Sequence, residues 1–205
     1  MKTRKRLQTP NVNFCYSTIY DQQCRAAFEL LPKQERSYPD SKTIMIFMRR
    51  LEKEWRKNER AVFHAIQLFS GIQWTVKQHT CYVVGSGIPF SDPLTMPVFA
   101  SHAPISYASD VLCHELIHRN FIEPLFQDRW RKAFLTLRKQ YPKDTKNVLV
   151  HVLVHAIHEQ IFLQLFSEER LKRDKRIMSV HPDYRRAWEI VEKVGAKKIS
   201  ETYLR

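Results

Sequence analysis

The 205-residue sequence contains few glycines, which make a chain flexible, and few cysteines, which can cross-link it. It has only 4 glycines and 4 cysteines, and it shows no glycine- or serine-rich linker, low-complexity run or internal repeat. The length then fits one domain, or one domain with an appendage. The cysteines form no CxxC pair, so we expect reduced thiols in or near the core. They are Cys15, Cys24, Cys81 and Cys113.

Long apolar runs are also missing. Histidine or charge interrupts each apolar stretch well short of the roughly 18 residues needed to cross a bilayer. No apolar signal core follows the basic segment 1–6. We therefore expect a cytoplasmic protein without a membrane partner. Apolar residues at 43% and aromatic residues at 12% suffice for a folded core.

Acidic residues are few relative to basic ones. The chain has 34 Lys and Arg against 21 Asp and Glu, which gives a net charge of +13 and a pI near 9.7. A polyanion such as nucleic acid would suit this charge. The basic residues are spread along the whole chain, however, and no RNA-binding or helix-turn-helix signature accompanies them. Nucleic acid is therefore an alternative partner that no motif supports.

The most informative segment that is present is HELIH at residues 114–118, an HExxH motif. Residues four apart share one face of a helix, so His114 and His118 can bind one zinc ion (Zn2+). Glu115 can then act as the general base toward a water on that metal. The motif indicates a zinc metalloendopeptidase with a peptide or protein substrate. The competing interpretation is a helix with two hydrogen-bonded core histidines. A chain of this composition would contain HExxH by chance in roughly one case in forty.

A second segment indicates where a third metal ligand would come from. The helix expected from Lys146 to about Leu171 is apolar nearly all round, as in a buried helix. Buried polar groups need partners, and a metal with its surrounding hydrogen bonds would supply them. Five polar residues fall within one arc of about 120° on this helix. They are Asn147, His151, His155, His158 and Glu159.

Four residues of this arc compete for the third ligand position. Glu159 would complete a His-His-Glu site and His155 a three-histidine site, and both sets are normal for catalytic zinc. His151 and His158 are less favoured. Whichever of Glu159 and His155 does not bind the metal would orient a ligand instead. The alternative to a metal site is an arc whose histidines form hydrogen bonds with the backbone or with buried water.

The HELIH motif, a small upstream sheet with an edge strand, a leading helix and a downstream helix with Glu159 together resemble the gluzincins. The compact size is similar to the minigluzincins. The resemblance covers roughly residues 41–166, and HExxH is its one specific motif. It implies an α+β, small zincin-like fold with a small, mostly antiparallel sheet, the HExxH helix, a buried glutamate helix and extra C-terminal helices.

The resemblance also implies roles for particular residues. His114 and His118 would be metal ligands, Glu115 the general base and Glu159 the third ligand. The sequence departs from the gluzincin pattern at Leu163, where that pattern has Asp. The added His151 and His155 are also outside the pattern.

The expected order of elements leads to a division into three parts. We expect an N-terminal extension at 1–40, a zincin-like catalytic domain at 41–171 and a packed C-terminal helical extension at 172–205. Surplus length at both ends makes a latent protease a further hypothesis. Helices are expected in seven ranges and strands in two, the second an edge strand because of Pro97. The helices are 21–31, 43–68, 107–122, 121–140 with a kink at Pro124, 146–171, 182–194 and a short one after Gly195; the strands are 73–84 and 95–100.

A peptidase also needs a group that stabilises the oxyanion of the tetrahedral state. His102, Tyr107 or a spare histidine of the polar arc could do this, and the sequence does not choose among them. The rival from another class is a non-enzymatic, zinc-stabilised basic domain that binds nucleic acid. Such a domain tolerates a closed tetrahedral metal site, whereas a peptidase needs an open one.

Overall fold

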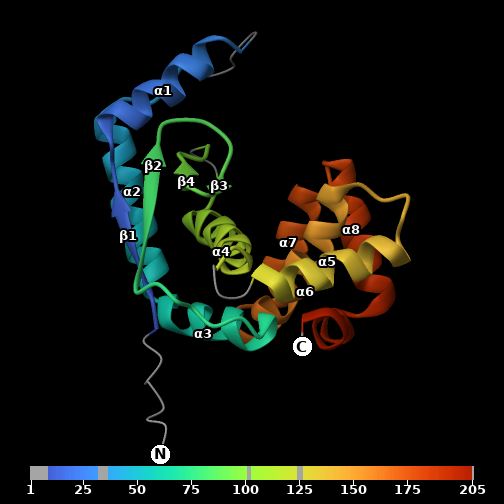
Figure 1. Cartoon of the computed structure of the whole chain (residues 1–205). Coiled ribbons are helices and arrows are strands. Elements are labelled where there is room, and N and C mark those ends of the chain that lie inside the picture. Colours follow the sequence, from blue (N-terminus) through green and yellow to red (C-terminus); the bar gives the residue numbers. More distant parts are fainter. Residues whose placement is uncertain (1–8, 32–36, 101–102, 124–126, 205) are drawn as a thin grey trace, which may run out of the picture. The chain divides into compact units, whose positions relative to one another are not determined.

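The computed structural model describes residues 9–31, 37–100, 103–123 and 127–204 (Figure 1). These residues form an α+β protein with helices α1 to α9 and a mixed sheet of four strands. Two compact units can be distinguished. The sheet unit comprises Pro10–Arg60 and Val76–Leu116, and the helical unit comprises Met1–Thr9, Ala61–Thr75 and Ile117–Arg205.

The sheet has the strand order β1-β2-β4-β3. β1 pairs with β2 in parallel, β2 pairs with β4 in parallel, and only β3 and β4 are antiparallel. The expectation of a mostly antiparallel sheet is therefore wrong. The reason is a strand in the segment expected to be an N-terminal extension, which pairs in parallel with β2, together with the parallel register of β2 and β4. The strands are β1 Asn11–Cys15, β2 Gln78–Val84, β3 Phe90–Ser91 and β4 Leu94–Pro97.

β1 is held by side chains from the end of a neighbouring helix. The Val12 amide donates to Glu59 Oε1 at 2.7 Å, and Arg56 Nη2 donates to the Val12 carbonyl at 2.9 Å. The indole nitrogen of Trp55 donates to the same Glu59 oxygen at 3.0 Å. β1 is an edge strand of the sheet. Side chains of the neighbouring helices thus supply hydrogen-bond partners for backbone groups of this strand that would otherwise be unpaired.

The edge position expected from Pro97 is wrong for the strand as a whole, because β4 lies between β2 and β3 in the sheet. β3 is short, however, and its register covers only Leu94 and Thr95 of β4. Pro97 pairs with Val84 of β2 and is the last residue of its strand. Pro97, which has no backbone N–H, thus lies beyond the residues of β4 that pair with β3.

In the described residues before β2, the helices are α1 Thr18–Glu29, α2 Ser41–Arg56 and α3 Glu59–Ser70. α2 runs beside β1 and β2 (Figure 1) and buries a face with helical spacing formed by Ile44, Phe47, Leu51 and Trp55. A single helix over 43–68 was expected, but it is broken at Lys57 and Asn58. Their amides donate to the carbonyls of Glu54 and Trp55, three residues back, which closes the last turn of α2.

Helix α4, Ile105–Phe121, carries the HExxH motif and confirms the helix expected over 107–122. It begins in the sheet unit and ends in the helical unit. The kink expected at Pro124 lies outside the described residues.

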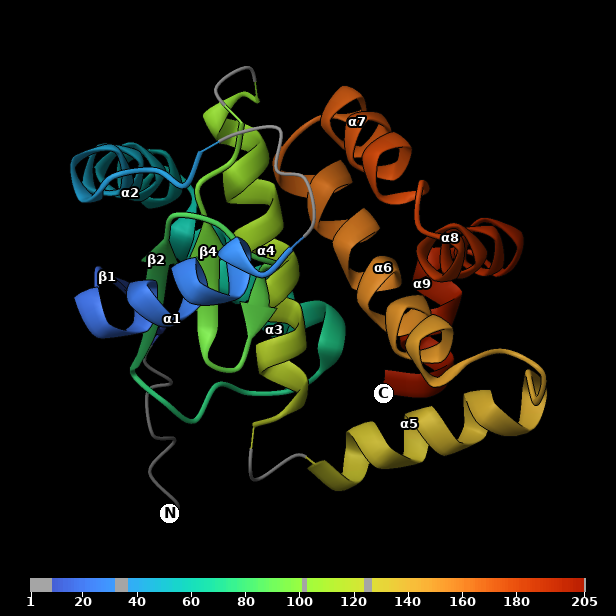
Figure 2. The ribbon, with the colours of Figure 1, turned by 90° about the horizontal axis from the view of Figure 1, so that it is seen from above.

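The helical unit is built around α6, Lys146–Leu165, which α7, α8 and α9 flank (Figure 2). Thr145 caps α6 by accepting from the Val148 amide at 3.1 Å. Most of α6 is buried, as its all-round apolar sequence predicts. It ends at Leu165 and not near Leu171, because Ser167 caps a new helix. The other members of the unit are α5 Gln127–Gln140, α7 Glu168–Met178, α8 Pro182–Val194, α9 Ala196–Ile199 and the π-helical turn Ser200–Leu204.

Within the described residues, α6 is also the one helix long and apolar enough to pass a length-and-composition test for a membrane span. In its most apolar window, 67% of the residues are buried inside the fold. The core helix of a globular unit passes the same test, so this is weak evidence for a span.

Candidate metal centre

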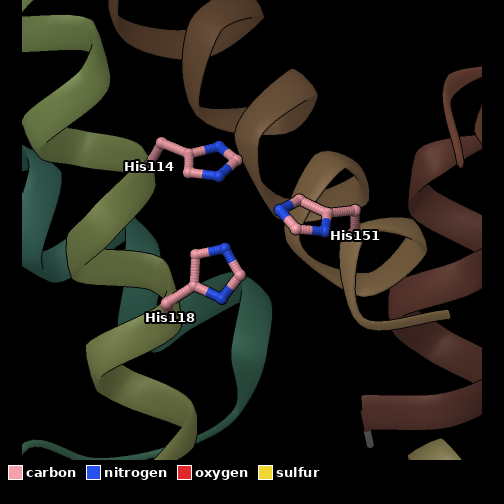
Figure 3. A group of neighbouring side chains, drawn as sticks. All are labelled: His114, His118 and His151. Carbon is pink, nitrogen blue, oxygen red and sulfur yellow. The ribbon is translucent and has the colours of Figure 1, made fainter. Parts of the chain in front are cut away.

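The two histidines of the HExxH motif lie one turn apart on α4. His114 is buried, with 5% of its surface exposed, and His118 is partly buried. Figure 3 shows that both imidazoles project from the same side of α4. The four-residue spacing predicts this shared face, and the structure confirms it.

A third imidazole completes the group. In the described part of the chain, His114, His118 and His151 form a cluster whose potential ligand atoms all lie within 4.8 Å of one another. Figure 3 shows the His151 ring, from α6, directed toward the two rings of α4. Nitrogens at the corners of a tetrahedron around zinc lie about 3.3 Å apart, given Zn–N bonds of about 2.0–2.1 Å.

The orientation of His151 is fixed by its own helix. Its Nδ1 lies 2.8 Å from the carbonyl oxygen of Asn147, one turn earlier on α6. A carbonyl accepts only, so Nδ1 carries the proton and donates, which leaves the Nε2 lone pair for a metal. The His118 and His151 rings meet edge to face, with centroids 4.9 Å apart at an interplanar angle of 70°.

Burial keeps His118 and His151 in the neutral form, which is the form of histidine that binds metals. It lowers the pKa of His118 to about 3, with smaller effects in the same direction from His151 and His158. Burial likewise lowers the pKa of His151 to about 4, against the opposing effects of the Asn147 hydrogen bond and the Asp183 charge. Both imidazoles are therefore neutral at neutral pH in the metal-free protein.

Glu115 follows His114 on α4 and is partly buried. Burial raises the pKa of its carboxyl to about 7. A general base works best when its pKa lies near the operating pH, so this value suits a group that accepts and returns a proton. The neighbouring Cys81 is fully buried, and its pKa is raised by burial and by the Glu115 charge, which makes it an inert thiol.

The structure does not bring the two favoured third-ligand candidates into the cluster. Glu159 forms an ion pair with Lys175, with Oε2 and Nζ 2.8 Å apart. The fully buried His155 stacks on Trp188, with ring centroids 4.1 Å apart and 9° between the planes. Its pKa is held well below the ordinary value by burial, with a smaller effect from His151. His151, a less favoured candidate, is the residue of the polar arc that meets His114 and His118.

The third histidine of the arc, His158, is buried against a different helix. His158 Nδ1 lies 3.6 Å from Asp174 Oδ2, and both residues are buried. The arc therefore faces several neighbours: His151 meets the HExxH histidines, His155 meets Trp188 and His158 meets Asp174. A helical wheel shows that these residues share a side of α6, but not which neighbour each one meets.

Of the groups considered for oxyanion stabilisation, His102 lies outside the described residues. Tyr107 packs edge to face on Phe99, with ring centroids 5.3 Å apart. Tyr184, which was not considered for this role, packs against a member of the cluster, with its ring centroid 4.2 Å from that of His151. No sequence signal singled out Tyr184, because it comes from α8 in the segment expected to be an appendage.

A comparison of the chain with models of known protein families, with curated proteins and with solved structures finds no match. The chemistry of this centre must therefore be inferred from the residues of the chain itself. The donor set is three imidazoles with a carboxyl group beside the first of them. Imidazole sets of this kind suit zinc and other first-row transition metals.

Proposed function

We propose that the protein is a zinc-dependent peptidase in which His114, His118 and His151 hold the metal and Glu115 is the general base. The observation that carries this proposal is the convergence of the HExxH histidines with a third imidazole within 4.8 Å. Three protein ligands leave a fourth position of a tetrahedral zinc open, which is the arrangement of catalytic rather than structural sites.

Zinc at this centre would supply Lewis-acid chemistry, lowering the pKa of water and polarising the scissile carbonyl. Glu115 takes the proton of the attacking water and passes it to the leaving amine. The partly buried position of its carboxyl keeps its pKa near neutrality, so one group can perform both transfers. His151 is held with Nε2 toward the centre by its bond to the Asn147 carbonyl.

The proposal departs from the gluzincin resemblance at the third ligand. A gluzincin-type site would use Glu159, but that carboxylate is paired with Lys175. A three-histidine set is equally normal for a catalytic zinc. The peptide substrate is inferred from the HExxH motif, whose Glu is the base of metallopeptidases.

The test combines metal content with hydrolysis. The purified protein should contain about one zinc per chain, measured by elemental analysis, and should cleave a protein or mixed peptide substrate. Glu115→Gln should keep the zinc and lose hydrolysis by about 10²-fold or more, because only the proton carrier is removed. Glu189→Gln, an exposed change on α8, is the matched control and should alter neither property.

Two outcomes would overturn the proposal. Full activity in Glu115→Gln would remove the general base from the mechanism. Bound zinc without cleavage of any peptide by the wild-type chain would favour a zinc-stabilised basic domain instead.

A further inference from the structure

The N-terminal end of α8 is bonded to the N-terminal end of α6. One carboxylate oxygen of Asp183, Oδ2, accepts from the Thr145 hydroxyl at 3.1 Å and from the Asn147 side-chain amide at 3.0 Å. Arg186, one turn further along α8, pairs with Asp144 just before α6, with nitrogen–oxygen distances of 3.0 and 3.3 Å. α8 is thus attached at successive residues that lead into the first turn of α6.

Asn147 connects this attachment to the candidate metal centre. Its side chain donates to Asp183, and its backbone carbonyl accepts from His151 Nδ1 at 2.8 Å. A shift of Asn147 therefore moves the acceptor that sets the plane and tautomer of the His151 ring. The Asp183 carboxylate is therefore connected to the His151 imidazole through two hydrogen bonds and one intervening residue, Asn147.

Tyr184 restrains the same ring by packing. Its ring centroid lies 4.2 Å from that of His151 at an interplanar angle of 47°. It also lies 6.0 Å from the ring of His155 and 5.5 Å from that of His181. His151 is thus held by a hydrogen bond at Nδ1 and by the tilted ring of Tyr184 packed against its own ring.

From these contacts we infer that Asp183 and Tyr184 are positioning residues that hold His151 in its metal-binding orientation. This inference rests on the metal site of the proposed function, but not on its hydrolytic activity. Groups that orient a ligand imidazole typically change metal affinity by about 10–100-fold when removed. The segment from residue 172 onward, expected as an appendage, is then part of the metal centre.

The experiment measures zinc affinity of the full chain by competition with a chelator, in the Glu115→Gln background so that self-cleavage plays no part. Asp183→Ala and Tyr184→Ala should each weaken zinc binding by about 10-fold or more. Asp183→Asn should restore most of the affinity, because an amide oxygen can accept the same two bonds. Tyr184→Phe should do likewise, because the ring is kept. Arg185→Ala, an exposed change on the same helix, is the control.

A second measurement separates positioning from loss of fold and from failure of the metal proposal. In metal-free protein labelled with ¹⁵N at histidine, the nitrogen shifts of His151 should report an Nδ1-protonated ring. Asp183→Ala should shift the ring toward a mixture of tautomers, while the helical circular dichroism is kept. Unchanged zinc affinity and an unchanged His151 tautomer in both alanine variants would overturn the inference. A wild-type chain that binds no zinc would overturn the proposed function, and the tautomer would still decide the positioning role.

Discussion

The rings of His118 and His151 meet edge to face with their centroids 4.9 Å apart, although they come from different helices. His118 belongs to the HExxH motif, and His151 belongs to the polar arc of α6. This contact brings His151, a less favoured third-ligand candidate in the sequence, against a histidine of the motif. It also gives the metal proposal its sharpest tests.

The first prediction concerns the identity of the third ligand. His151→Ala should lower zinc affinity by at least about 100-fold, because two imidazoles are left to hold the ion. Glu159→Gln should leave affinity within about two-fold of wild type, because this side chain pairs with Lys175. His64→Ala, an exposed histidine of α3, controls for the loss of any imidazole. Loss of zinc in Glu159→Gln with retention in His151→Ala would reverse the assignment in favour of the gluzincin pattern.

The second prediction concerns stability. Zinc that binds only the folded chain should stabilise it by about 2.7 kcal/mol when free zinc is 100 times its dissociation constant. Thermal unfolding followed by circular dichroism should show a rise in Tm on adding zinc and its reversal by a chelator. The rise should vanish in His151→Ala and persist in His64→Ala. An equal rise in both variants would mean that zinc binds elsewhere.

The third prediction concerns the stability of the protein at alkaline pH. It tests a hydrogen bond that lies away from the candidate metal centre. Tyr38 donates to the buried Asp21 carboxylate at 2.5 Å. Burial first, and then this hydrogen bond and the Asp21 charge, raise the pKa of Tyr38 above its ordinary value. The folded state therefore keeps the phenol proton after the unfolded state loses it. The stabilisation is present below the unfolded pKa of about 10 and is lost as pH rises above it.

Tyr38→Phe removes that stabilisation at the outset. At pH 8 the variant should be less stable than wild type by about 1.5–3 kcal/mol, the range for a hydrogen bond to a charged group. The difference should shrink between about pH 10 and 11 in urea-unfolding experiments. A difference that stays constant across this range would show that the phenol proton does not contribute.

The fourth prediction tests β1. Glu59 Oε1 accepts from the Val12 amide and from the Trp55 indole, so Glu59→Ala leaves two donors without this acceptor. The free energy of unfolding should fall by about 1–3 kcal/mol. Glu52→Ala is the control, because Glu52 is 40% exposed and pairs with the same Arg56. It should cost less than about 1 kcal/mol. Equal effects of the two changes would mean that Glu59 acts only as a surface charge.

The sequence predicts the helices of the site better than it predicts the sheet. Local signals mark α6, which has Thr145 at its N-cap, and α8, which begins with Pro182. β1 has no such signal, because Glu59, which accepts from the Val12 amide, lies 47 residues away. The parallel pairing of β1 with β2 likewise depends on the path of the intervening helices.

The candidate site shows the same limit. Helical spacing is enough to place His114 and His118 on one face and to gather the polar arc on one side of α6. It cannot say which member of the arc meets α4, because that depends on the rotation of α6 against its neighbours. In the structure His155 faces Trp188 and Glu159 faces Lys175, while His151 meets His118.

The Asn147 carbonyl serves two donors at once. In an α-helix it accepts the backbone N–H of the residue four positions on, which is His151, and it also accepts from the Nδ1 of that residue's ring. When the first turn of α6 frays, the imidazole loses its anchor together with the helix. At the proposed zinc site, ordering of that turn is therefore coupled to metal binding. Zinc should slow hydrogen exchange at the His151 amide, reporting occupancy of the centre through the backbone.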